Sequence, residues 1–300
     1  MSLFKGLSAF PITPADASGR VDIDALGRLL LRIRDAEADS VGLLGSTGGY
    51  AFLTGEERLR AMDAAMNAVG GAIPVIVGVG AIRTSDAQTL AKAAKIAGAD
   101  GLLLAPVSYA PLTEEEVYAH FAAVAEAGQL PLCIYNNPGT TKFVFTNSLI
   151  AKLSKVANIA AVKMPLPAQD DFEGELEYLR GHTPTTFRIG YSGDSGAAPS
   201  LLAGGDAWYS VVGGLLPVQA LALTRAAQSG DRARTGEIDE AFQPLWALFR
   251  QFGSFRVMYT IADVLGLCKV DPPLPVLPIP ETAREQVRVA ITELQRRVPG

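Results

Sequence analysis

The chain has 300 residues, of which 49% are apolar and 19% are charged, so it can bury a large core. Its net charge of −5 and the lack of any basic run argue against a nucleic-acid partner, which selects clustered Lys and Arg. No apolar stretch approaches the roughly 20 residues needed to cross a bilayer. The first residues also lack the charged and apolar regions of a signal peptide. We therefore expect a cytoplasmic protein without a membrane partner.

The cysteines and histidines do not indicate a metal site. Cys133 and Cys268 lie far apart and match no ligand spacing, and His120 and His182 complete no ligand set. We expect a reduced protein that binds no metal.

Taken in chain order, short apolar runs alternate with amphipathic stretches. The runs end in Gly, Pro or small polar residues, and their near-continuous hydrophobicity is typical of strands covered on both faces, as in parallel sheets. We predict eight strands, which lie at residues 6–12, 41–45, 74–80, 101–106, 130–136, 159–163, 187–192 and 207–212.

Capping residues indicate helices between these strands. Asp22 precedes a leucine-rich stretch with helical spacing, and Thr54 and Thr113 each precede glutamates that favour a first helical turn. Eight strand-helix units match a (β/α)₈ TIM barrel better than a doubly wound sheet. The glycine-rich fingerprint of dinucleotide-binding folds is also missing after the first strand.

The last 70 residues or so contain no clear strand. We predict helices around residues 232–251, 254–267 and 281–298, and the proline-rich stretch 271–280 between them cannot be helical. The expected organisation is a barrel over residues 1–230 and a C-terminal helical region over residues 231–300.

Lys163 ends the sixth run, and its position marks it as a candidate nucleophile. The two-residue period of a strand places it on one face with Ala161 and Ile159, above the packed interior of the barrel. Such a site disfavours the charged form of an amine, which must lose its proton before it attacks a carbonyl. The structural alternative is a lysine whose stem lies along the strand end while its ammonium reaches water.

Tyr135 ends the fifth run and alternates with Cys133, so it should also face the barrel mouth. A phenol there could relay the protons that carbinolamine formation and breakdown require. Alternatively, its ring belongs to the core and its hydroxyl lies at the rim.

The segment Gly45-Ser-Thr-Gly-Gly49 places Ser46 and Thr47 after the second strand, where hydroxyl and backbone N–H groups suit a carboxylate or phosphate. A glycine-rich turn between a strand and a helix gives the same pattern without a function. Ser192-Gly-Asp194, after the seventh strand, is explained equally by a turn with a helix-capping Asp. An anion cradle, a proton relay and a desolvated amine at one barrel mouth are together the parts that an enamine-forming enzyme of 2-oxo acids needs.

At these residues the sequence resembles the family of dihydrodipicolinate synthase and N-acetylneuraminate lyase, which are class I (β/α)₈ barrels. The resemblance implies that Lys163 forms an imine with pyruvate or a related 2-oxo acid, that Tyr135 relays protons, and that Ser46 and Thr47 hold the carboxylate. It also implies that no cofactor is needed and that the chain forms a dimer or homotetramer. The motifs that carry it are Ala9-Phe-Pro-Ile-Thr-Pro14, Gly45-Ser-Thr-Gly-Gly49, Tyr135-Asn-Asn-Pro138, Val162-Lys163 and Ser192-Gly-Asp194.

Several positions depart from the family pattern. Gly49 stands where the family usually has Glu, and Thr140 stands where the synthases carry an arginine for the second substrate's carboxylate. Without that guanidinium the bidentate anion clamp is lost. A tyrosine that often reaches a neighbouring subunit is matched by Ser108, with Tyr109 one residue later, so the relay is expected to be altered. Candidate relay or substrate contacts are therefore Ser108, Tyr109, Thr140, Gly193 and Tyr209.

These features predict a Schiff-base lyase or aldolase and leave its second substrate open. The alternatives are a 2-keto-3-deoxy sugar-acid aldolase or dehydratase, a sialic acid lyase, a cyclic imino-acid deaminase, or a true 4-hydroxy-tetrahydrodipicolinate synthase. A barrel that binds 2-oxo acids without catalysis is a different class of function. A phosphate-binding barrel enzyme would depend on the glycines of Val211-Val-Gly-Gly-Leu215, which a plain turn also explains.

Overall fold

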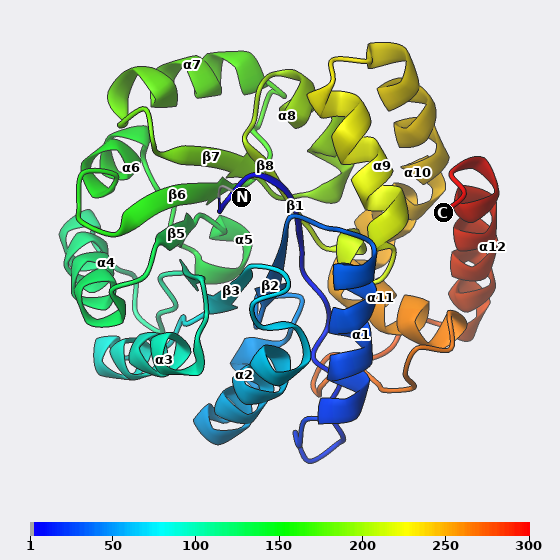
Figure 1. Cartoon of the computed structure of the whole chain (residues 1–300), viewed down its shortest axis with the longest axis horizontal. Helices are drawn as coiled ribbons and strands as arrows, with labels where there is room; N and C mark the ends of the chain where they lie inside the picture. The colour runs from blue at the N-terminus through cyan, green and yellow to red at the C-terminus, as the bar shows by residue number, and fades with distance from the viewer. Residues whose placement is uncertain (1–2) are drawn as a thin grey trace.

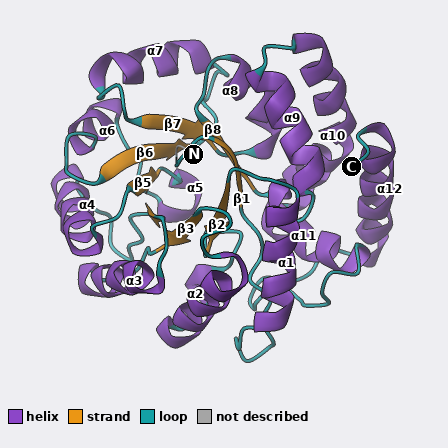
Figure 2. Ribbon diagram, in the orientation of Figure 1, coloured by secondary structure: helices purple, strands orange, loops and turns teal. Residues whose placement is uncertain are grey.

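Eight parallel strands form a closed barrel, in which each strand pairs with its neighbours in sequence and β1 pairs with β8 (Figures 1 and 2). The computed structural model describes residues 3–300. Every strand overlaps a predicted run, so the barrel prediction is confirmed. The strands are β1 (Gly6–Ala9), β2 (Ser40–Leu43), β3 (Val75–Gly78), β4 (Gly101–Leu104), β5 (Leu132–Tyr135), β6 (Ile159–Met164), β7 (Arg188–Tyr191) and β8 (Ala207–Ser210).

Helices surround this barrel, and the predicted caps start three of them. The Asp22 carboxylate accepts from the backbone of Ala25, the Thr54 hydroxyl accepts from Glu57, and Thr113 forms a capping box with Glu116. The helices are α1 (Ile23–Asp35), α2 (Gly55–Val69), α3 (Thr84–Ala97), α4 (Glu114–Gly128), α5 (Pro138–Thr141), α6 (Asn147–Leu153), α7 (Phe172–His182), α8 (Ala197–Leu202) and α9 (Pro217–Gln228), with short 3₁₀ segments η1 (Tyr50–Phe52), η2 (Asp194–Gly196) and η3 (Val212–Gly214).

The C-terminal helices lie on one side of the barrel (Figure 1). They are α10 (Arg232–Phe252), which packs on α9, α11 (Ser254–Val264) and α12 (Glu281–Arg297). The predicted end of α11 at residue 267 is too late, because Gly266 takes a positive φ of 66° that ends the helix. Residues 271–280 form no helix, as predicted. A boundary between two regions at residue 230 stays a prediction.

The barrel interior is filled by side chains of the inner strand faces. The prediction that Ile159 shares this face with Lys163 is wrong, since Ile159 packs in the outer core between strands and helices. The pairing of β5 with β6 shifts register between Leu132 and Cys133, so Leu132 pairs with Ile159 and Cys133 with Ala161, which interrupts the two-residue period. The inner cluster consists of Phe4, Phe10, Ile76, Leu103, Ala105, Cys133, Tyr135, Ala161, Ala207 and Tyr209.

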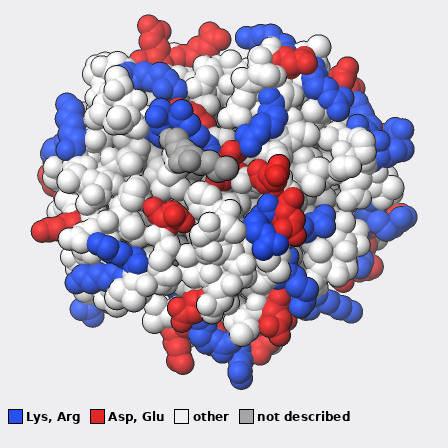
Figure 3. Space-filling model, in the orientation of Figure 1, with Lys and Arg blue, Asp and Glu red and all other residues white. Residues whose placement is uncertain are grey.

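Acidic and basic side chains are interspersed on the molecular face shown in Figure 3. Within residues 3–300, no helix is both long and apolar enough to cross a membrane.

Candidate active site

Lys163 lies at the exit of β6 with only 3% of its surface exposed. Its Nζ lies 4.1 Å from the ring centroid of Phe10, 4.2 Å from that of Tyr135 and 5.7 Å from that of Tyr209. Within residues 3–300, no carboxylate forms an ion pair with this amine. The aromatic faces are therefore its main electrostatic partners, and a cation over such a face gains about 0.5–2 kcal/mol.

Tyr135 is the register partner of Lys163 on the neighbouring strand. Its side chain is buried, and its hydroxyl accepts a hydrogen bond of 2.9 Å from Nδ2 of Asn137. The phenol oxygen is thus held at the barrel mouth beside the amine. The structure therefore places together the two residues that the strand ends indicated.

Phe10, which we did not predict as a site residue, forms the floor beneath the amine. A Cβ at Gly42 would lie 2.2 Å from its ring, and one at Gly45 would lie 2.6 Å from it. The ring therefore occupies space that these two glycines leave free. The glycines of the second strand and its exit are the sequence signal that could have indicated a large neighbour.

The segment that holds Ser46 and Thr47 begins at Gly45, which lies against the ring of Phe10. Thr47 is buried, Ser46 is half-buried, and the N–H of Gly49 donates to the carbonyl of Ser46 at 3.1 Å. Gly49 adopts a φ of 62°, a conformation that glycine takes at little cost. Within residues 3–300, the Thr47 hydroxyl has no hydrogen-bond partner, so it is free to bind an anionic group.

Asp194 links the exits of β7 and β8. Its buried carboxylate accepts hydrogen bonds from Nε1 of Trp208 (3.0 Å) and from the backbone N–H groups of Val211 (3.0 Å) and Val212 (2.7 Å). Burial raises the pKa of Asp194 to about 6, although these hydrogen bonds and the charge of Lys163 act in the opposite direction. The side chain thus fixes the loop after β8, and does not cap a helix of its own.

Replacing Asp194 by Ala is expected to lower the free energy of unfolding by about 3 kcal/mol, because two buried donors and one partly buried donor lose their acceptor. Urea titration of both proteins at pH 7 measures this difference. Because the folded pKa exceeds the ordinary value of 3.8, this group also makes wild-type stability fall as the pH rises from about 4 to about 6. Asp231→Ala, which removes an exposed cap, is the control and should cost about 1 kcal/mol.

Three predicted contacts lie away from this cluster. Thr140 is exposed, and its hydroxyl donates to the carbonyl of Asn137. The Ser108 hydroxyl donates to the carbonyl of Ala110, and Tyr109 is 98% exposed. Neither residue of the fourth strand's exit therefore reaches Tyr135 within one chain.

The other two predicted contacts belong to the barrel mouth. Tyr209 is fully buried, and Sγ of Cys133 lies 3.5 Å from its hydroxyl. Burial raises the pKa of the Cys133 thiol to about 12, so this thiol stays neutral. Gly193 follows β7 with a φ of 95°, and a Cβ there would lie 2.8 Å from Leu166. A side chain at position 193 would thus be strained and crowded.

The glycines after β8 offer little to a phosphate. The N–H groups of Val211 and Val212 donate to Asp194, and that of Gly213 donates to Oγ of Ser210. The next two N–H groups donate to carbonyls in the same turn. The plain turn therefore explains this segment. Within residues 3–300, no cluster of His, Cys, Asp and Glu is arranged to hold a metal ion.

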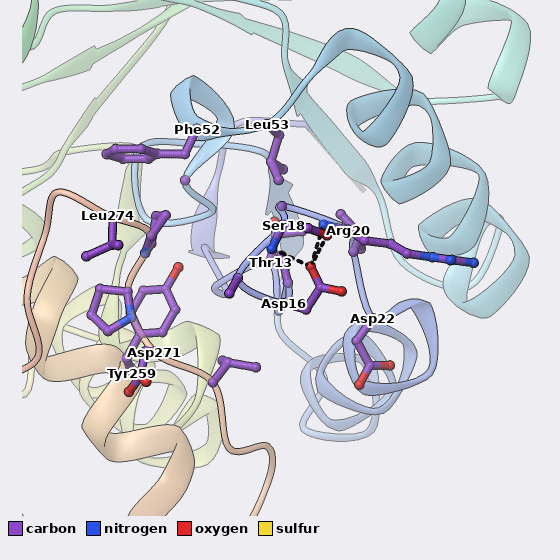
Figure 4. Close-up of a pocket in the computed structure, with 18 of the residues that line it drawn as sticks. Thr13, Asp16, Ser18, Arg20, Asp22, Phe52, Leu53, Tyr259, Asp271 and Leu274 are labelled. Atoms are coloured by element: carbon purple, nitrogen blue, oxygen red, sulfur yellow. Dashed lines mark hydrogen bonds between the residues drawn. The ribbon is translucent and has the colours of Figure 1, made fainter.

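A cleft of about 900 Å³ lies beyond the Gly48–Gly49 turn, where the loop after β1 faces the C-terminal region (Figure 4). Phe52, Tyr259 and Leu274 line one side of it, and the turn that contains Asp16 lines the other. The cleft borders the segment Gly45–Gly49, through Gly48 and Gly49, but does not include Lys163 or Tyr135. The cleft therefore gives room for a ligand group that extends outward from the Gly45–Gly49 segment.

A parallel barrel with a buried amine and a phenol at the carboxyl ends of adjacent strands defines a barrel enzyme, since active sites of this fold lie at that end. The model of the dihydrodipicolinate synthetase family matches residues 3–294. The chain belongs to this family, whose members are lyases of the class I aldolase type. The family resemblance and the enzyme class expected from the sequence are both confirmed.

Relatives match over almost the whole chain. The 4-hydroxy-tetrahydrodipicolinate synthase of Gluconacetobacter diazotrophicus is 34% identical over 295 residues, which cover 97% of each chain. That of Pseudomonas aeruginosa is 34% identical over 284 residues, which cover 94% of this chain and 95% of the relative. The crystal structure of dihydrodipicolinate synthase from Agrobacterium tumefaciens is 57% identical, with a TM-score of 0.96 over 97% of this chain and 98% of that chain.

Proposed function

We propose that the protein is a lyase in which Lys163 forms a Schiff base with pyruvate or a related 2-oxo acid. The observation that carries this proposal is the 3% exposed amine without a carboxylate partner, surrounded by Phe10, Tyr135 and Tyr209. Burying an unpaired charge is costly, and an amine that no carboxylate holds in an ion pair is available to attack a carbonyl. Ordinary strand-end lysines avoid that cost by reaching water.

The neighbouring groups fit the remaining steps. The neutral amine would attack the ketone carbon, Tyr135 would protonate the carbinolamine oxygen that leaves as water, and the resulting iminium would accept electrons from an adjacent bond. Ser46 and Thr47 would hold the carboxylate with hydroxyl and backbone donors. Gly193 and Tyr209 would contribute backbone and ring surface at the mouth.

The second substrate is where the chain departs from its relatives. Thr140 has no guanidinium, which favours a reaction other than lysine-pathway synthesis: sugar-acid aldol cleavage or dehydration, sialic acid cleavage, or deamination of a cyclic imino acid. The names of the relatives favour 4-hydroxy-tetrahydrodipicolinate synthase as the second candidate. A direct assay for 4-hydroxy-tetrahydrodipicolinate, compared with pyruvate release from 2-keto-3-deoxy acids, separates these reactions. Binding of 2-oxo acids without turnover or an adduct would indicate a non-catalytic barrel.

Borohydride reduction in the presence of pyruvate tests the proposal directly. We expect one pyruvate-derived adduct per chain, which peptide mass spectrometry should locate on Lys163, because borohydride reduces an imine to a stable amine. Omitting pyruvate is the control. If several 2-oxo acids are tried and none leaves an adduct on Lys163, the proposal is wrong.

We also propose that the chain forms a homo-oligomer, either a dimer or a tetramer. Large apolar side chains are exposed at the exits of the third, fourth and fifth strands, namely Ile82 (70%), Tyr109 (98%) and Val144 (68%). Apolar surface of this kind often marks an interface. Among the structural neighbours is a monomeric dihydrodipicolinate synthase variant, 25% identical with a TM-score of 0.89, so size-exclusion chromatography with light scattering should test the proposed assembly.

A further inference from the structure

Tyr50 directs its hydroxyl to the exits of β3 and β4. It follows the Gly45–Gly49 turn and is half-buried. A Cβ at Gly80 would lie 3.4 Å from the Tyr50 hydroxyl and 3.3 Å from the carbonyl oxygen of Ala105. The hydroxyl therefore occupies the space beside Gly80 at the barrel mouth, although Tyr50 belongs to the segment after β2.

This position lies next to Tyr135. Leu104 of β4 pairs with Ile134 of β5, so the following residues of these strands, Ala105 and Tyr135, are neighbours in the same inner cluster. Burial raises the pKa of Tyr50 to about 12, and the charge of an ionised Tyr135 contributes to this rise. Tyr50 and Tyr135 thus approach the same strand exit, with Gly80 and Ala105 between them.

Arg58 holds Tyr50 in place. Its buried guanidinium donates to the carbonyls of Gly78 (2.9 Å) and Gly80 (3.0 Å), and its Cζ lies 5.2 Å from the Tyr50 ring centroid. Burial lowers the pKa of Arg58 to about 10, so it stays charged near neutral pH. That charge opposes the effect of burial on Tyr50 and makes its hydroxyl a better proton donor than burial alone would allow.

Tyr135 needs a group that returns its proton. Within residues 3–300, its hydroxyl accepts from Asn137 and has no acceptor for its own proton. Ser108 uses its hydroxyl within its own loop, and Tyr109 faces solvent. We propose that Tyr50 supplies this proton within one chain, directly or through one water, and so acts as a positioning residue for the relay of Tyr135. This inference rests on the proposed Schiff-base function.

The proton transfers balance. The neutral Lys163 nitrogen bonds to the ketone carbon, and one of its two protons passes to the former ketone oxygen, which gives the carbinolamine. The carbinolamine C–O bond then breaks as this oxygen takes the Tyr135 proton and leaves as water. Tyr135 recovers a proton from the Tyr50 hydroxyl, and the half-buried Tyr50 recovers one from hydronium or a buffer acid in the solvent, which supplies the positive charge of the protonated imine. The products are a protonated imine and one water molecule, and both phenols are restored.

The test is the rate at which the borohydride-trapped pyruvate adduct appears in Tyr50→Phe, measured by rapid quenching. The substitution keeps the ring and its contact with Arg58. We expect the rate to fall about 10- to 100-fold, the final yield of adduct to stay the same, and the half-saturating pyruvate concentration to change less than about twofold. Added imidazole buffer should speed the variant and not the wild type, because a small acid can replace the missing donor.

Tyr118→Phe is the matched control and should keep the wild-type rate, and Tyr109→Phe is the variant that tests the alternative donor. A wild-type rate in Tyr50→Phe would overturn the inference, as would a slow rate in Tyr109→Phe, which would assign the relay to the exposed tyrosine. If adduct formation is slow in the Tyr50→Phe variant and imidazole buffer does not speed it, the role of Tyr50 is structural, and the inference is also overturned. Absence of any adduct in the wild type is a different outcome, since it removes the proposed function itself.

Discussion

Lys163→Ala is expected to lower turnover by a factor on the order of 10⁴ or more and to eliminate the trapped pyruvate adduct, because it removes the amine that forms the imine. Steady-state kinetics on the substrate that the product assays select, together with mass spectrometry of the reduced protein, measure both effects. The circular dichroism spectrum should stay unchanged, since a small side chain at a strand exit leaves the barrel pairing intact.

The chain offers a matched control for this substitution. Lys152 lies 4.4 Å from the ring centroid of Tyr118, so it resembles Lys163 in having an aromatic neighbour, but it is exposed on α6. Lys152→Ala should keep both turnover and the adduct. An adduct that persists in Lys163→Ala would move the nucleophile to another lysine.

Tyr135→Phe is expected to lower kcat by about 10²- to 10⁴-fold, because the variant keeps the ring 4.2 Å from the amine and loses only the hydroxyl that exchanges protons. The loss of the hydrogen bond from Asn137 should cost about 1 kcal/mol of stability, too little to unfold the barrel. Kinetics and urea titration of the same sample separate the two effects.

Tyr118→Phe is the corresponding control, and we expect it to retain the wild-type kcat. The pyruvate adduct should still form in Tyr135→Phe, only more slowly. Near-normal turnover in Tyr135→Phe would contradict the proton-transfer role and would leave this tyrosine as a packing residue.

The sequence predicted the features that depend on neighbouring residues along the chain. The apolar runs gave the strands, and Thr54 and Thr113 gave helix starts, because capping acts within one turn. Lys163 and Tyr135 were found for a related reason, since a polar residue at the end of an apolar run identifies a strand exit. Because the strands of the barrel are arranged in chain order, β5 and β6 are neighbours, and Tyr135 pairs directly with Lys163.

Features that depend on contacts between distant segments could not be predicted. The outward position of Ile159 results from a register shift between two strands, and only their pairing reveals it. Asp194 looked like a helix cap because its partners, Val211 and Val212, lie 17 and 18 residues further on. Tyr50 lies in an ordinary loop sequence, and only the folded barrel brings its hydroxyl to Gly80.

Phe10 has a consequence for how this sequence can diverge. Its ring fills space that Gly42 and Gly45 leave open, so a larger residue at either position would collide with it. The three positions can therefore change only as a set during evolution. A lineage that lost one of these glycines would need a smaller residue in place of Phe10, and the amine of Lys163 would then lose its aromatic floor.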